Sequence, residues 1–133
     1  MKKYLLDTNI CIFYMKGKYQ LNIKVRKVRQ QNCYISEITV AELLYGAAFS
    51  QDKERNLAEV NEFISKFEIL PIRPALEIFG ESKATLRKQG LLIDDFDILI
   101  GATAVINKMI MVSENQKHLS RIPGIKTENW VMR

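Results

Sequence analysis

The sequence predicts an α/β fold, a three-layer α/β/α sandwich with a central, mainly parallel sheet. Two observations carry this prediction. Short β-branched runs of the kind found in buried strands alternate with longer segments of helical periodicity. In addition, the segment around residue 100 is apolar on every side, as expected of a central helix. This alternation indicates crossover units, which build a parallel sheet between helices.

The expected elements follow one another without a linker, a repeat or a low-complexity segment, so residues 1–133 are expected to form a single domain. Residues that commonly end strands and helices support these boundaries: the first strand ends at Asp7, and glycines follow two of the helices, at Gly17 and Gly90. In chain order we expect a strand at 4–6, helices at 10–15 and 21–31, a strand at 33–35, helices at 38–49 and 53–66, a strand at 69–72, helices at 74–89 and 95–107, and strands at 109–112 and near 125–130.

The composition is that of an ordinary globular protein, with 47% hydrophobic and 26% charged residues. Twenty Lys and Arg residues against fifteen Asp and Glu give a net charge of +5. The first thirty residues carry much of the excess, since their only acid is Asp7. This asymmetry suits a polyanionic partner or, equally, a solvated helix face.

Two classes of protein are disfavoured by the sequence. Cys11, Cys33 and His118 cannot supply the four ligands of an ordinary zinc site, so the cysteines are expected to be buried free thiols. The basic and then apolar N-terminus is interrupted by Asp7 and Asn9, and no run of about 18 apolar residues exists that could span a membrane. We therefore expect a cytoplasmic protein without a membrane segment.

Carboxylates are the candidate functional groups. Asp7 follows the first expected strand, and ligands bind at the carboxyl ends of parallel strands, although Asp is also a good helix N-cap. Glu42 is the only charge between Ile38 and Phe49, on a helix face shared with apolar residues, yet Thr39 and Glu42 also match a capping box. Both interpretations remain open for each acid.

Three more acids, Asp94, Asp95 and Asp97, stand at the start of the apolar segment. Asp94 as N-cap with Asp97 at the third helical position would account for two of them. That account leaves unexplained why the helix behind them is apolar all round. Acids from three elements could instead meet in one pocket, and oxygen ligands without thiolate or imidazole select Mg²⁺ or Mn²⁺.

An acidic metal pocket in a basic protein suits a nucleic-acid substrate. Basic residues would hold the phosphate backbone, while the metal would polarise a phosphoryl oxygen and acidify a water molecule. Lys117, His118 and Arg121 could contact phosphate; His118 is not needed as a general base, and we expect it to be a surface residue.

Several segments, in this order, resemble the PIN-domain ribonucleases and, among them, the VapC-type toxins of bacterial toxin–antitoxin pairs. These segments are LLDTNICIF at 5–13, ISEITVAELLYGA at 35–47, ERN at 54–56, FDILIGATA at 96–104, VSEN at 112–115 and RIPGIKTENW at 121–130. The resemblance implies a PIN-like fold.

The resemblance also implies roles for individual residues. Asp7, Glu42 and Asp97 match the family's metal-binding acids. Asn115, beside Ser113, matches the fourth acidic or amide position of the family's catalytic site, which we call the fourth corner. The supporting residues that it indicates are Thr8, Asn9, Asp94, Asp95 and Ser113. The chain departs from its relatives in having Asp94 and Asp95, where Gly, Pro or Asn is frequent, and an amide at the fourth corner.

By the same resemblance, we expect an Mg²⁺- or Mn²⁺-dependent endoribonuclease that leaves 5′-phosphate and 3′-hydroxyl ends, with transfer RNA among its expected substrates. Its expected partners are a cognate VapB-type antitoxin and a second copy in a homodimer. The main alternative is a non-catalytic PIN-like module that binds RNA or protein. An aspartyl phosphatase is disfavoured because Asn9 stands where its second acid belongs. A nuclease for DNA or ribosomal-RNA processing is a further alternative.

Overall fold

The sheet of the protein is entirely parallel. A computed structural model describes residues 1–133 and has five strands in the order β3-β2-β1-β4-β5. The chain adds strands on one side of β1, then returns to its other side, so the strand order reverses between β1 and β4. The strands are β1 (Tyr4–Leu6), β2 (Cys33–Ser36), β3 (Glu68–Leu70), β4 (Ile110–Val112) and β5 (Lys126–Glu128).

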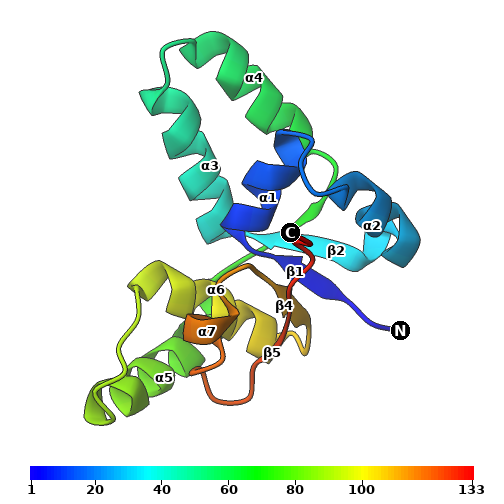
Figure 1. Ribbon diagram of the computed structural model, residues 1–133. Helices are drawn as coiled ribbons and strands as arrows, with labels where there is room; N and C mark the ends of the chain where they lie inside the picture. The colour runs from blue at the N-terminus through cyan, green and yellow to red at the C-terminus, as the bar shows by residue number, and fades with distance from the viewer.

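Helices cover both faces of this sheet. The helices α1 to α4 lie on one side and α5 to α7 on the other, which confirms the predicted three-layer arrangement (Figure 1). The helices are α1 (Thr8–Met15), α2 (Leu21–Val28), α3 (Glu37–Phe49), α4 (Lys53–Ile64), α5 (Leu76–Lys88), α6 (Asp95–Ile106) and α7 (Gln116–Leu119), with short 3₁₀ turns η1 (Gln30–Asn32) and η2 (Arg73–Ala75).

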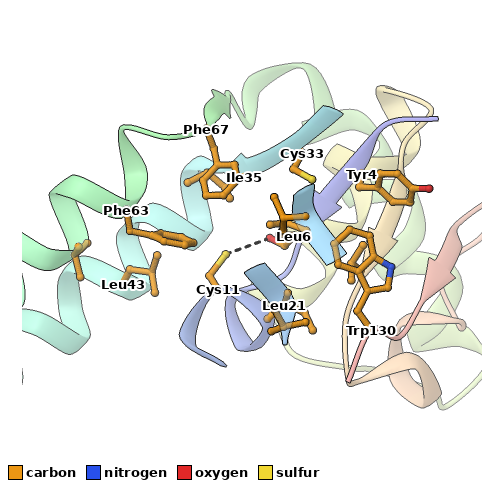
Figure 2. Packing of buried hydrophobic residues seen from close by; sticks show 14 of the residues in the cluster. Tyr4, Leu6, Cys11, Leu21, Cys33, Ile35, Leu43, Phe63, Phe67 and Trp130 are labelled. Atoms are coloured by element: carbon orange, nitrogen blue, oxygen red, sulfur yellow. Dashed lines mark hydrogen bonds between the residues drawn. The ribbon is translucent and has the colours of Figure 1, made fainter. Parts of the chain in front are cut away.

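Alternation along the strands builds two cores. Leu6 and Ile35 point to the side of α1 to α4, where Phe63 of α4 packs against α3 (Figure 2). Leu5 and Met111 point the other way, into a cluster with residues of α6. Because successive side chains of a strand face opposite sides, a sheet covered on both faces needs strands that are apolar throughout. The apolar runs of the sequence reflect this requirement.

The structure departs from the predicted helices at several places: α1 begins at Thr8 rather than at residue 10, and α4 ends at Ile64 rather than at residue 66. The helix expected at 21–31 ends at Val28, because Arg29 takes a left-handed φ of 80°. The helix expected at 74–89 starts two residues late, since Pro74 belongs to η2. The four-residue helix α7 was not predicted, being too short to show a periodicity.

The remaining expectations concern burial. Both cysteines are buried and free, as predicted. The helix α6 buries six residues, but its apolar residues Phe96 and Ile106 are exposed, so this central helix is not buried on every side. None of the helices has both the length and the apolar character needed to cross a membrane.

Candidate active site

The reversal of strand order between β1 and β4 positions the candidate site. Loops that leave two such strands in opposite directions open a crevice at the carboxyl edge of the sheet. Asp7 follows β1 and Ser113 follows β4, and the Asp7 backbone N–H donates to the Val112 carbonyl at 2.9 Å. The topology therefore places these two polar residues side by side, although 106 positions separate them in the chain.

Asp7 is buried and fully hydrogen-bonded. Its Oδ1 accepts from the Thr8 backbone N–H at 2.8 Å, which confirms that Asp7 is the N-cap of α1. Its Oδ2 accepts from the Ser113 hydroxyl at 2.7 Å and from the Asn9 amide at 3.3 Å. Burial nevertheless raises the pKa of Asp7, which outweighs the opposite effect of the bonds from Ser113 and Thr8.

Asn9 and Ser113 connect the loop after β1 to the loop after β4. The Asn9 amide also lies 3.3 Å from the Ser113 hydroxyl, and its Oδ1 accepts from the Glu114 backbone N–H. The backbone N–H of Asn115 donates to the Ser113 hydroxyl at 2.9 Å. Asn115 is the N-cap residue of α7, but its side-chain amide does not cap that helix.

Glu42 projects from the middle of α3 towards the start of α1. The Thr8 hydroxyl donates to Glu42 Oε1 at 2.6 Å and lies 3.0 Å from the Thr39 hydroxyl. The capping-box interpretation of Thr39 and Glu42 is wrong, because α3 begins two residues earlier and its N-cap is Ser36, which accepts from Ile38. Thr39 is instead fully buried within the helix and contacts Thr8.

The three acids of the apolar segment have different environments. Asp94 is the N-cap of α6 and accepts from the Phe96 backbone N–H, as predicted. Asp95 pairs with Lys83 of α5 at 3.0 Å on the exposed side of the helix. Asp97, the third helical residue, takes part in none of the three ion pairs of the structure. Asp97, unlike Asp95, therefore has no cationic partner, and unlike Asp94 it caps no helix.

The charges of neighbouring acids act on the pKa values of Asp7 and Asp97. The pKa of Asp97 is raised to about 6, mainly by its partial burial and also by the charges of Asp7, Asp94 and Glu42. Glu42 likewise raises the pKa of Asp7. No basic group counters either shift. Negative charge is thus concentrated around these acids without a basic side chain to balance it.

The donor set fits a hard divalent cation in its chemistry, because every candidate ligand is a carboxylate or amide oxygen. The geometry is less complete. No three His, Cys, Asp or Glu side chains lie close enough together to hold a metal ion. Thr8 holds Glu42 and Ser113 holds Asp7, while mutual repulsion opposes closer approach of the carboxylates.

An apolar groove of about 620 Å³ adjoins Glu42. Glu42 and Thr8 lie at its polar end, while Tyr45 and Phe96 are among its apolar lining. Tyr45 is 67% exposed and stacks on the more exposed Phe49 at 5.9 Å. The apolar face around Glu42 therefore faces solvent at its far end, whereas Ile38 on the same face is buried. Helical periodicity alone does not distinguish a groove from a core.

Of the basic residues after the fourth corner, Lys117 and His118 are exposed on α7, as expected for surface residues. Arg121 donates to the Leu91 carbonyl at 3.4 Å, which ties it to the loop before α6.

Comparison with known proteins defines the family. The model of the PIN domain matches residues 4–125, nearly the whole chain. The chain belongs to the PIN-domain family. Its relatives include Ribonuclease VapC2 of Haemophilus influenzae, 42% identical over 98% of this chain and 100% of the relative. A second relative, the tRNA(fMet)-specific endonuclease VapC of Shigella flexneri, is 38% identical over 98% of this chain and 99% of its own.

Solved structures place the chain among PIN domains of the VapC type, as the sequence resemblance predicted. A DNA-bound VapBC complex from Salmonella typhimurium contains a chain that matches with a TM-score of 0.90 and 36% identity, covering 98% of this chain and 99% of that one. VapBC2 from Rickettsia felis, bound to a promoter DNA fragment, matches with a TM-score of 0.88 and 33% identity over 96% and 98%. The PIN-like fold is thus confirmed.

Proposed function

We propose that this PIN-domain protein is an Mg²⁺- or Mn²⁺-dependent endoribonuclease and the toxin of a VapBC-type pair, acting on cellular RNA in the cytoplasm. One observation carries the proposal. Asp7, Glu42 and Asp97 come from three different elements; Thr8, next to Asp7, donates to Glu42, and the charges of Asp7 and Glu42 both raise the pKa of Asp97 with no basic side chain countering them. The names of the VapC relatives support ribonuclease chemistry, and those of two relatives indicate transfer RNA as the substrate class.

The side chains of the crevice have separate tasks in this proposal. Asp7, Glu42 and Asp97 would hold the cation, and the free amide of Asn115 would face the same site. When bound, the cation would polarise a phosphoryl oxygen and acidify a water molecule for in-line attack on phosphorus. Ser113 and Asn9 keep the Asp7 carboxylate in place through their hydrogen bonds. Asp94 fixes the start of α6, and with it the position of Asp97.

The proposed function is tested by incubating the purified protein, freed of any antitoxin, with total RNA. We expect discrete fragments with 5′-phosphate ends in Mg²⁺ or Mn²⁺ and none in EDTA. Sequencing those ends identifies the substrate. If the protein binds RNA but cuts it with neither metal, the catalytic proposal fails and the non-catalytic module replaces it.

The hydroxyl of Thr8 is expected to orient the Glu42 carboxylate for cleavage. Thr8→Val removes the donor to Glu42 while conserving the volume of the side chain, so Glu42 loses the contact that directs it into the crevice. We expect cleavage to fall about tenfold, as for other groups that orient a metal ligand. Thr8→Ser keeps the hydroxyl and should retain most activity. Equal loss in both variants would contradict the positioning role, as would no loss in Thr8→Val.

The partners proposed for this chain are an antitoxin and a second copy. Solved relatives are toxin–antitoxin complexes, which supports the antitoxin; the second copy is proposed from the family resemblance. The groove that ends at Glu42 offers an antitoxin exposed aromatic side chains beside uncompensated carboxylates. An apolar segment carrying a basic residue would complement both features.

A further inference from the structure

The amino edge of the sheet, opposite the acids, carries a cluster of lysines. Lys2 and Lys3 precede β1, Lys108 precedes β4, and Lys126 begins β5; we call these four residues the amino-edge lysine patch. The three strands are neighbours (Figure 1), and Tyr4, Ile110 and Lys126 are aligned in register. With strands about 4.8 Å apart, the patch spans roughly 10 Å.

Two adjoining hollows give the patch its shape. One, of about 260 Å³, is lined by all four lysines together with Met1 and Ile110. The other, of about 190 Å³, shares Lys108 and Lys126 with the first. Neither hollow has an acidic residue in its lining. The surface is therefore concave as well as positively charged.

The charges of the patch are not neutralised within the protein. None of its lysines takes part in any of the three ion pairs of the structure, and all four are exposed. Lys3 alone has a further contact, with its Nζ 5.6 Å from the centre of the Tyr34 ring. Four like charges held together raise the local concentration of anions and attract a polyanion.

We propose that the amino-edge lysine patch binds the phosphate backbone of the substrate RNA away from the bond that is cleaved. This inference rests on the proposed function. Lys3 and Asp7 are four residues apart along an extended strand, so the patch and the acids are separated by about 13 Å along the sheet. A phosphate on the patch therefore cannot be the one that is cut. RNA that reaches both edges must therefore extend at least about 13 Å, or roughly four nucleotides at about 3.4 Å each. The enzyme thus favours long or folded RNA over short fragments.

The test compares Lys108→Gln/Lys126→Gln with the charge-matched control Lys53→Gln/Lys88→Gln, whose lysines are exposed on α4 and α5. On a long RNA that the wild type cuts, we expect KM of the patch variant to rise about tenfold and kcat to stay within about twofold. Binding of uncut RNA in EDTA should show a slope of log K against log salt shallower by about 1.5, since each lost phosphate contact removes 0.7 to 0.9. The control should keep both wild-type values.

The outcomes separate this inference from the function it rests on. If the wild type cuts no RNA, the proposed function fails, and the salt slope in EDTA still tests the patch. If the patch variant and the control have the same KM and the same slope, the inference is overturned. It is also overturned if the patch variant loses only its affinity for an antitoxin while cleavage is unchanged.

Discussion

Asp97→Asn is expected to abolish RNA cleavage while making the metal-free protein more stable. Loss of one carboxylate from the proposed cation site should slow cleavage about a thousandfold, or ~4 kcal/mol of transition-state stabilisation. The same change removes a charge that Asp7, Asp94 and Glu42 repel in the folded protein. After allowance for solvent screening, we expect the free energy of unfolding at neutral pH to rise by about 1 kcal/mol, or about 3 °C in Tm.

The stability gain should depend on pH in a defined direction. The pKa of Asp97 is raised from 3.8 to about 6 in the folded protein, so the folded state binds its proton more tightly than the unfolded chain does. The stability of the wild type should therefore fall as pH rises from about 4 to about 6, and this part of the fall is absent in Asp97→Asn. Thermal melts in EDTA across this range measure the difference, which should be largest above pH 6.

Asp95→Asn is the matched control. It removes a carboxylate from the same turn of α6, but one that is paired with Lys83 outside the crevice. It should retain cleavage and gain no stability at neutral pH. If Asp97→Asn cleaves RNA at the wild-type rate, Asp97 is not a cation ligand. If it melts below the wild type at pH 7, the uncompensated charge does not destabilise the protein.

Gly101→Val is expected to destabilise the fold by about 3 kcal/mol. A Cβ at Gly101 would lie 2.4 Å from Ile122 Cδ1 and 3.3 Å from Ile125 Cδ1, and Ile122 is itself buried. The ends of the Ile122 and Ile125 side chains must move to admit the valine, and because Ile122 is buried and the core offers little free space, their displacement disturbs the packing of α6. Urea denaturation measures the loss.

Gly80→Val provides the comparison within another helix. A Cβ at Gly80 of α5 meets nothing within 4 Å, so the substitution should change stability by only about 0.5 kcal/mol. Similar stability of the two variants would contradict the close packing of α6 at Gly101. Because α6 carries Asp97, the Gly101 variant should also lose activity at temperatures where it remains folded.

The central strands β1, β2 and β4 could be predicted well because they are short, mostly apolar runs whose composition reflects burial on both faces, whereas the edge strand β5 is Lys-Thr-Glu. Helix ends were harder to predict. The end of α2 depends on a left-handed φ at Arg29, and arginine gives no signal for that conformation. The start of α3 depends on Ser36, which is a residue of β2 as well as the N-cap, so the capping box that the sequence offered as one alternative at Thr39 and Glu42 was wrong. Local patterns identify elements better than their ends.

The site was predictable in its charges but not in its contacts. Acids at the end of a strand and the start of an apolar helix indicated a shared pocket, and family motifs named Asp7, Glu42 and Asp97. No local pattern indicated that Ser113 would donate to Asp7 or Thr8 to Glu42, because such contacts depend on the sheet topology. The groove beside Tyr45 was likewise not foreseen, since an apolar helix face predicts burial.

The hydrogen bond between Ser113 and Asp7 has a consequence for how the protein is made. A ribosome synthesises β1 first, but β4 and the residues after it emerge only near the end of translation. Contacts of such long sequence separation form late, after local helices. A nascent chain therefore holds the first acid of the proposed catalytic centre without its hydroxyl partner or Asp97. The ribosome that makes this proposed toxin should be protected from it until the chain is almost complete.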